Sequence, residues 1–251
     1  MKKENLFLST IAGDAPEVAR AHGLGLEIAE YCTARNMDQV FLQTHEAVLQ
    51  KLDGIPNRVL HGPFNELFPC AIDPMARELA RHRYRQALEL ARQYGARKLV
   101  LHGGYNPRIY YPCWYTEQSV LFWKEFLPEI PENMEICLEN VLEEEPNMLV
   151  EILRGVDSPR LRMCLDVGHA NVYSKVPVAH WLAACAPCIS HFHLHNNGED
   201  YDAHQALDQG TIDLASLLKS AQALCPGATY TLELMNAGPS VRWLSEIRVL
   251  P

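Results

Sequence analysis

The sequence predicts an α/β fold in which eight parallel strands, each followed by a helix, close into a barrel. Short apolar segments alternate with longer amphipathic ones along all 251 residues, and strands joined by helical crossovers run parallel. A domain of eight such units typically takes about 250 residues. Because no linker or low-complexity tract interrupts the alternation, we expect a single (β/α)8 TIM barrel over residues 1–251.

The expected strands are short apolar runs. We place them at residues 5–11, 24–31, 58–62, 97–102, 134–139, 161–166, 189–193 and 230–233. The seventh run has the clearest pattern, because Phe192 and Leu194 alternate with His191, His193 and His195. A two-residue period is typical of a strand whose two faces have different surroundings.

The expected helices lie between these strands. We place them at residues 15–22, 37–52, 74–94, 116–126, 146–153, 178–184, 213–224 and 240–247. The third has the clearest boundaries, with Asp73 as a cap, Pro74 at its first position and Gly95 after its end. A longer loop, residues 103–115, precedes the fourth helix.

The composition narrows the class of protein. A hydrophobic content of 48% in a chain of this length can build one sizeable core. The formal charge of −9 and the lack of a strong basic run disfavour a nucleic-acid partner without excluding it. Bound metal ions would offset part of this negative charge locally, so the charge alone does not decide the question.

The sequence also predicts a cytoplasmic protein with no membrane partner. Lys2 and Lys3 precede only a short apolar run, residues 6–8, and no stretch approaches the roughly 20 apolar residues of a membrane span. Several of the eight cysteines lie in apolar runs, as reduced and buried thiols do. Cys185 and Cys188 lack a second pair at zinc-finger spacing, so we interpret them as structural. A homo-oligomer is compatible with the sequence.

Carboxylates and imidazoles stand at the carboxyl ends of six expected strands, where TIM barrels carry their active sites. They are His61, His102, Glu139, Asp166 with His169 just after it, His193 with Asp202 and His204 in its loop, and Glu233. A large apolar residue such as Leu60 or Leu138 precedes nearly every strand-end one. Since adjacent strand residues point to opposite faces, we expect the polar side chains to converge in the barrel mouth.

A divalent metal ion accounts for this convergence. Four carboxylates without a Lys or Arg among them would repel strongly in a cleft of low dielectric constant, and a cation removes that repulsion. Mixed imidazole and carboxylate ligands suit zinc, manganese, iron or cobalt better than calcium. We expect zinc or manganese, with one to three ions.

Each of these residues also has a structural interpretation when it is taken alone. His61 or His102 could be a hydrogen-bonded core histidine, and Asp202 with His204 could belong to an ordinary polar loop. We interpret His191 and His195 as supporting or structural residues. Buried carboxylates in apolar runs, such as Glu139 and Glu233, are uncommon unless they are paired or bound to metal. Residues with unrelated structural roles would not all lie at the ends of strands.

Four segments carry a resemblance to a known family. They are CLDVGHAN from residue 164, HFHLHN from residue 191, DAHQALDQGTID from residue 202 and LEL from residue 232. With them, essentially the whole barrel resembles the xylose isomerase-like TIM barrel superfamily. That superfamily holds the AP endonuclease family 2 enzymes and many sugar isomerases and epimerases.

The resemblance implies different ligand sets in two branches of the superfamily. In the isomerase and epimerase branch, one divalent metal is held by residues that match Glu139, Asp166, His193 and Glu233. The two glutamates there also serve as an acid/base pair, and the match to His169 contacts substrate. The endonuclease IV branch binds three zinc ions and adds matches to His61, His102, His169, Asp202 and His204.

The chain departs from the family pattern in the loop after the seventh strand. Asp208, Gln209 and Gly210 stand where the family usually has Gly-Glu-Gly, and Asn196 and Asn197 stand where it often has Asp. These departures bear on the geometry around Asp202 and His204.

Three functions remain open at this point. The first is a metal-dependent isomerase or epimerase of a small sugar, by proton transfer between two metal-bound glutamates. The second is a multinuclear zinc phosphodiesterase, either an AP endonuclease or a hydrolase of a small phosphoester. The third is a metal-binding barrel without catalysis. The acidic charge bears on the substrate and favours the first function. The number of candidate ligands bears only on the number of metal ions, so it does not favour the second.

An aromatic loop follows the fourth strand and bears on the substrate. Its members are Tyr105, Tyr110, Tyr111, Trp114 and Tyr115. They could form a lid that packs on a sugar face, or they could be ordinary loop packing.

Overall fold

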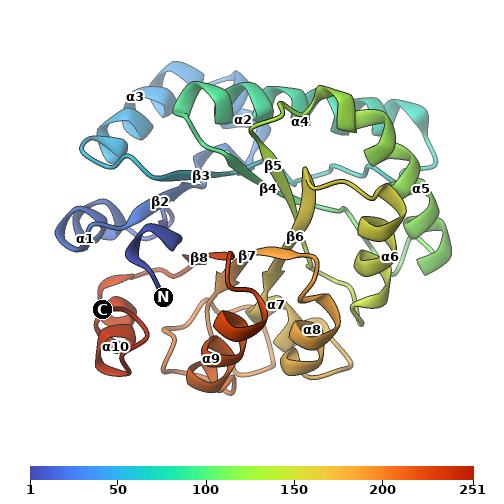
Figure 1. Cartoon of the computed structure of the whole chain (residues 1–251). Coiled ribbons are helices and arrows are strands. Elements are labelled where there is room, and N and C mark those ends of the chain that lie inside the picture. The colour runs from blue at the N-terminus through green and yellow to red at the C-terminus, as the bar shows by residue number, and fades with distance from the viewer.

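Eight parallel strands close into a barrel in the computed structural model, which describes every residue from Met1 to Pro251 (Figure 1). Each strand pairs with its neighbours in the sequence, and the last pairs with the first. The strands are β1 (Leu6–Ser9), β2 (Gly25–Ile28), β3 (Arg58–His61), β4 (Lys98–His102), β5 (Glu135–Glu139), β6 (Leu161–Asp166), β7 (Ile189–Leu194) and β8 (Thr229–Leu232). The predicted (β/α)8 TIM barrel is therefore confirmed.

The helices lie outside the barrel (Figure 1). They are α1 (Ala15–His22), α2 (Ala34–Asp38), α3 (Phe41–Leu52), α4 (Pro74–Tyr94), α5 (Pro112–Phe126), α6 (Asn147–Val156), α7 (Val167–Tyr173), α8 (Val178–Cys185), α9 (Leu214–Leu224) and α10 (Gly238–Glu246). Short 3-10 turns lie at Lys3–Asn5, Glu30–Cys32 and Leu127–Glu129. None of the helices is both long and apolar enough to cross a membrane.

The ends of α4 lie where the sequence predicts them. The Asp73 carboxylate accepts a hydrogen bond from the backbone N–H of Met75 at 2.8 Å. This bond satisfies one of the N–H groups that the first helical turn leaves free. Gly95 ends the helix in the left-handed conformation, with φ of 69°, which glycine adopts without steric cost.

Three elements differ from the expected ones. The expected helix at residues 37–52 is divided into α2 and α3, because Val40 leaves the helical conformation with φ −123° and ψ 27°. Helix α5 begins at Pro112, a residue whose fixed φ suits a first turn, so the expected loop is shorter. Helix α7 follows β6 directly, where no helix was expected.

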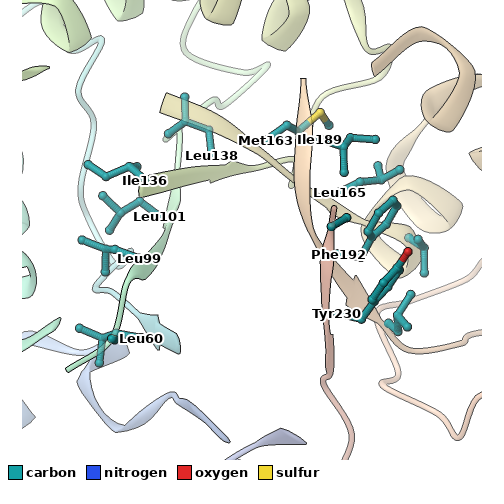
Figure 2. Packing of buried hydrophobic residues seen from close by; sticks show 14 of the residues in the cluster. Leu60, Leu99, Leu101, Ile136, Leu138, Met163, Leu165, Ile189, Phe192 and Tyr230 are labelled. Atoms are coloured by element: carbon teal, nitrogen blue, oxygen red, sulfur yellow. The ribbon is translucent and has the colours of Figure 1, made fainter. Parts of the chain in front are cut away.

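The apolar residue before each strand-end residue packs outward against the helices. Figure 2 shows this layer, which includes Leu60, Leu101, Leu138, Leu165 and Phe192, within a cluster of 67 buried residues. The predicted alternation between outward apolar and inward polar side chains is therefore correct. All eight cysteines are free thiols, and most of them are buried.

A smaller apolar cluster fills the barrel interior. It consists of Phe7, Val59, Val100, Cys137 and Cys164. The last four precede strand-end polar residues by two positions, and residues two apart on a strand share a face. This apolar layer therefore lies directly below the strand-end residues and supports them.

Truncation of the outward layer should destabilise the fold. Leu101 is fully buried, so we expect Leu101→Ala to lower the free energy of unfolding by about 2–5 kcal/mol through lost burial and a cavity. Leu121→Ala is the matched control, because Leu121 is 54% exposed and its truncation should cost less than about 0.5 kcal/mol. Urea unfolding followed by circular dichroism measures both, and equal losses would contradict the packing described.

Candidate metal centre

The carboxylate of Glu139, at the end of β5, lies at the centre of four imidazoles. Its two oxygens are 3.2 Å from His61 Nε2, 3.4 Å from His102 Nε2, 3.1 Å from His169 Nδ1 and 3.4 Å from His193 Nδ1. The side chain is 1% exposed. Parallel strands that end at the same level bring these groups together, as the sequence predicts.

His193, on β7, directs one ring nitrogen at three carboxylates. Its Nδ1 lies 3.4 Å from Glu139 Oε2, 3.7 Å from Asp166 Oδ2 and 3.7 Å from Glu233 Oε2. This buried nitrogen has no hydrogen-bond partner. Buried polar atoms are rarely left unpaired, and one imidazole facing carboxylates from three strands is a donor set that zinc or manganese accepts. The residues present therefore fit a divalent cation.

The predicted loop residues Asp202 and His204 lie against this first group. Asp202 Oδ2 is 3.3 Å from His169 Nε2 and 3.0 Å from His204 Nε2. His204 has a positive φ of 45°, which is uncommon for a residue other than glycine. The structure thus brings all nine predicted residues into one connected cluster.

His195 lies inside the cluster rather than outside it. Its Nε2 is 3.1 Å from both oxygens of Asp166, and its ring stacks on His204 with centroids 4.1 Å apart. Gly168 makes room for this ring, because a Cβ at residue 168 would overlap it. This close approach explains the glycine between Asp166 and His169. His195 contacts a site carboxylate directly, which agrees with the supporting role expected from the sequence.

Sequence reasoning missed Glu27, on β2. Its side chain is fully buried, and its Oε1 lies 3.0 Å from His193 Nε2. The available signal was a glutamate inside an apolar run, which is the same signal that singled out Glu139 and Glu233. His191 contacts the other oxygen of Glu27 and does not reach the carboxylates of the mouth, so its expected supporting role agrees with its position.

A model of the xylose isomerase-like TIM barrel family matches residues 18–250. This chain belongs to that family. Uncharacterized protein MJ1311 of Methanocaldococcus jannaschii is 28% identical over 198 residues, which cover 73% of this chain and 66% of that protein. The chain therefore spans slightly less than two thirds of the length of this relative.

Two solved structures are also similar to this xylose isomerase-like barrel. A D-tagatose 3-epimerase-like protein superposes with a TM-score of 0.80 at 23% identity, covering 97% of this chain and 96% of that one. The TTHB071 protein from Thermus thermophilus, from a crystal soaked with ZnCl2, has a TM-score of 0.77 at 24% identity, covering 98% of each chain. Identities this low establish a shared fold.

Opposing charges shift the pKa values within the xylose isomerase-like site. Burial alone would raise the pKa of Glu139, but His193, His102 and His169 outweigh it and hold that pKa well below its usual range. Burial lowers the pKa of His204, but Asp202 and Glu233 outweigh it and raise the value to about 9. Without a cation, Asp202 and Glu233 therefore favour the protonated form of His204, and a metal that binds His204 must compete with that proton.

The aromatic loop is mostly packed into the fold. Tyr105, Tyr110 and Tyr115 are buried and Trp114 is half-buried, whereas Tyr111 is 80% exposed. Ordinary packing therefore describes four of the five aromatic residues, and only Tyr111 is free to meet a substrate.

A separate groove of about 650 Å3 runs between α7, α8 and α9. It is lined by residues such as Asn171, Leu182 and Leu217, and by none of the cluster histidines. We assign the chemistry to the barrel mouth rather than to this groove, because the buried titratable groups converge at the mouth.

Metal binding should release protons. Imidazole ligands must be neutral to bind a cation. Burial lowers the pKa of His193, but Cys164, Glu27 and Glu139 outweigh it and raise that pKa well above its usual range. If at least one proton leaves per ion, affinity for Mn²⁺ should rise about tenfold per pH unit between pH 6 and pH 8. Competition titration with a metal indicator measures this dependence, and an affinity that stays flat over the range would contradict it.

Proposed function

We propose that this protein is a divalent-metal-dependent isomerase or epimerase of a small sugar or sugar-like substrate. The observation that carries the proposal is the pair of carboxylates beside one unpartnered nitrogen. Glu139 and Glu233 lie 3.4 Å and 3.7 Å from His193 Nδ1 and come from β5 and the end of β8. Two carboxylates around one cation position are suited to move a proton between two faces of a bound substrate.

Glu139, Asp166, His193 and Glu233 would hold the cation. When bound, the cation would polarise the carbonyl of a ketose and make the neighbouring C–H more acidic. One of the two glutamates would remove that proton, and the other would return one to the substrate. His169, whose Nδ1 is 3.1 Å from Glu139, would contact a substrate oxygen. The similarity to a D-tagatose 3-epimerase-like protein supports a sugar as the substrate class.

A second candidate is a multinuclear zinc phosphodiesterase. The observation that favours it is the additional group formed by Asp202 and His204, which is in contact with His169. Two or three ions there could hold a hydroxide and the oxygens of a phosphoester. The net charge of −9 disfavours DNA and leaves a small phosphoester as the better substrate of this class.

Proton exchange distinguishes the two candidates. The metal-loaded enzyme should incorporate deuterium from D2O at the carbon next to the carbonyl of a ketose, in a panel that includes D-tagatose and D-fructose. Glu233→Gln should lower the exchange rate by at least about 100-fold, because general acid–base groups contribute factors of about 10²–10⁴. Proton NMR of the sugar measures the exchange, and elemental analysis verifies that the variant still holds metal.

Glu135→Gln is the matched control, because Glu135 lies at the opposite end of β5 from Glu139. It should keep the wild-type exchange rate. A metal-loaded enzyme that exchanges no ketose proton but hydrolyses bis(p-nitrophenyl) phosphate would overturn the first proposal in favour of the second.

A further inference from the structure

We propose that Glu27 is a positioning residue that selects Nδ1 of His193 as the atom offered to the cation. The proposal rests on the metal centre of the proposed function and adds a residue to it. One carboxylate oxygen of Glu27 lies within 4.8 Å of ligand atoms of His61, His193 and Glu233, so Glu27 borders the centre from β2. It acts through the opposite nitrogen of the His193 ring.

The two oxygens of Glu27 have different surroundings. Oε2 accepts a hydrogen bond from the Thr231 hydroxyl at 2.6 Å and lies 3.0 Å from His191 Nε2. Oε1 lies 3.0 Å from His193 Nε2, but neither of these two atoms has a hydrogen-bond partner. One oxygen is thus held in place by hydrogen bonds, and the nearest imidazole nitrogen to the other belongs to His193.

The support for Glu27 comes from across the barrel. Glu27 is on β2, whereas His191 and Thr231 are on β7 and β8, which are not neighbours of β2 in the sheet. His191 is held in turn, since its Nδ1 lies 2.6 Å from the hydroxyl oxygen of Thr229. Both histidines of β7 face the barrel interior, and their β8 partners in register are Thr229 and Thr231. Four buried side chains and that of the half-buried Thr229 therefore form one polar group inside the barrel.

The fold does not require this polar group. TIM barrel interiors are normally filled by branched apolar side chains, as in the adjacent cluster of Phe7, Val59, Val100, Cys137 and Cys164. Burial of a carboxylate with only histidines and hydroxyls around it is costly, and apolar residues of similar volume are often at least as stabilising. Glu27 is fully buried, so its presence points to a role other than stability.

The role follows from the chemistry of imidazole. A neutral histidine carries its proton on one ring nitrogen and a lone pair on the other. A carboxylate beside Nε2 of His193 favours the proton there. The lone pair is then on Nδ1, which faces Glu139, Asp166 and Glu233. Carboxylates that orient metal-binding histidines in this way typically change metal affinity by about 10–100-fold when they are removed.

The test is the affinity of the full chain for Zn²⁺ and Mn²⁺ alone, measured by competition titration. Glu27→Gln keeps the shape but offers His193 a neutral amide, and we expect its dissociation constant to rise by about 10–100-fold. Glu143→Gln is the matched control. Glu143 is equally a buried carboxylate, but its partners are the Tyr115 hydroxyl and the Val141 N–H. The control should bind both ions as the wild type does.

Unfolding with a chelator present separates positioning from structure. A positioning role predicts that Glu27→Gln loses metal affinity yet still unfolds cooperatively without metal, with the loss of stability that removal of one partner of a buried ion pair brings. Lower stability with unchanged affinity would overturn the proposal. If Glu27→Gln does not fold, Thr231→Val carries the test, because it removes one donor to Glu27 and should weaken metal binding to a smaller extent.

The outcomes also separate this inference from the proposed function. Absence of metal binding by the wild type would overturn the metal centre and this inference with it. Tight binding by the wild type, with unchanged affinity in both Glu27→Gln and Thr231→Val, would overturn only the role of Glu27.

Discussion

The candidate metal centre depends on carboxylates that are buried together with histidines as their only ion-pair partners. Glu27, Glu139 and Asp166 are almost fully buried, and the imidazoles near their oxygens come from β3, β4, β7, the residue after β7 and α7. Asp166 also accepts a hydrogen bond from the backbone N–H of His169 at 2.6 Å. Such a group is costly in a region of low dielectric constant unless positive charge balances it. Protons on the imidazoles or a bound cation can supply that charge, so protonation and metal binding are linked.

Along each strand, residues that stabilise the fold alternate with residues that face the candidate site. Outward side chains such as Leu101 and Leu138 join the large apolar layer beneath the helices, whereas their neighbours His102 and Glu139 face the mouth. Because adjacent strand residues point to opposite faces, the site can collect charged groups without disturbing the packing that holds the helices. The exchange of a mouth residue should therefore alter metal binding or catalysis more than folding.

The fold and most of the candidate site could be predicted from the sequence, because both follow from local patterns. Alternating strands and helices specify a parallel barrel, and parallel strands place their carboxyl ends at one level. That rule alone brings His61, Glu139, Asp166 and Glu233 together.

The rest of the site depends on contacts that no local pattern encodes. Glu27 reaches His193 across the barrel, between strands that are not neighbours. His195 stacks on His204, a residue of the loop after β7 with a positive φ. The helix α7 begins at the residue after Asp166, and Asp166 serves at once as strand end, helix cap and candidate ligand. Because β6 and α7 meet at Asp166 without an intervening segment, the division of the sequence into strands and helices did not predict α7.

Elemental analysis is the decisive test of whether the barrel mouth binds a divalent metal. The protein should be purified without chelators or a histidine tag and compared with His193→Ala, which removes the one nitrogen that faces all three carboxylates. We expect at least one zinc or manganese ion per wild-type chain and a clear loss in the variant. A wild-type protein that holds no divalent metal, even after incubation with excess Zn²⁺ or Mn²⁺, would contradict this expectation.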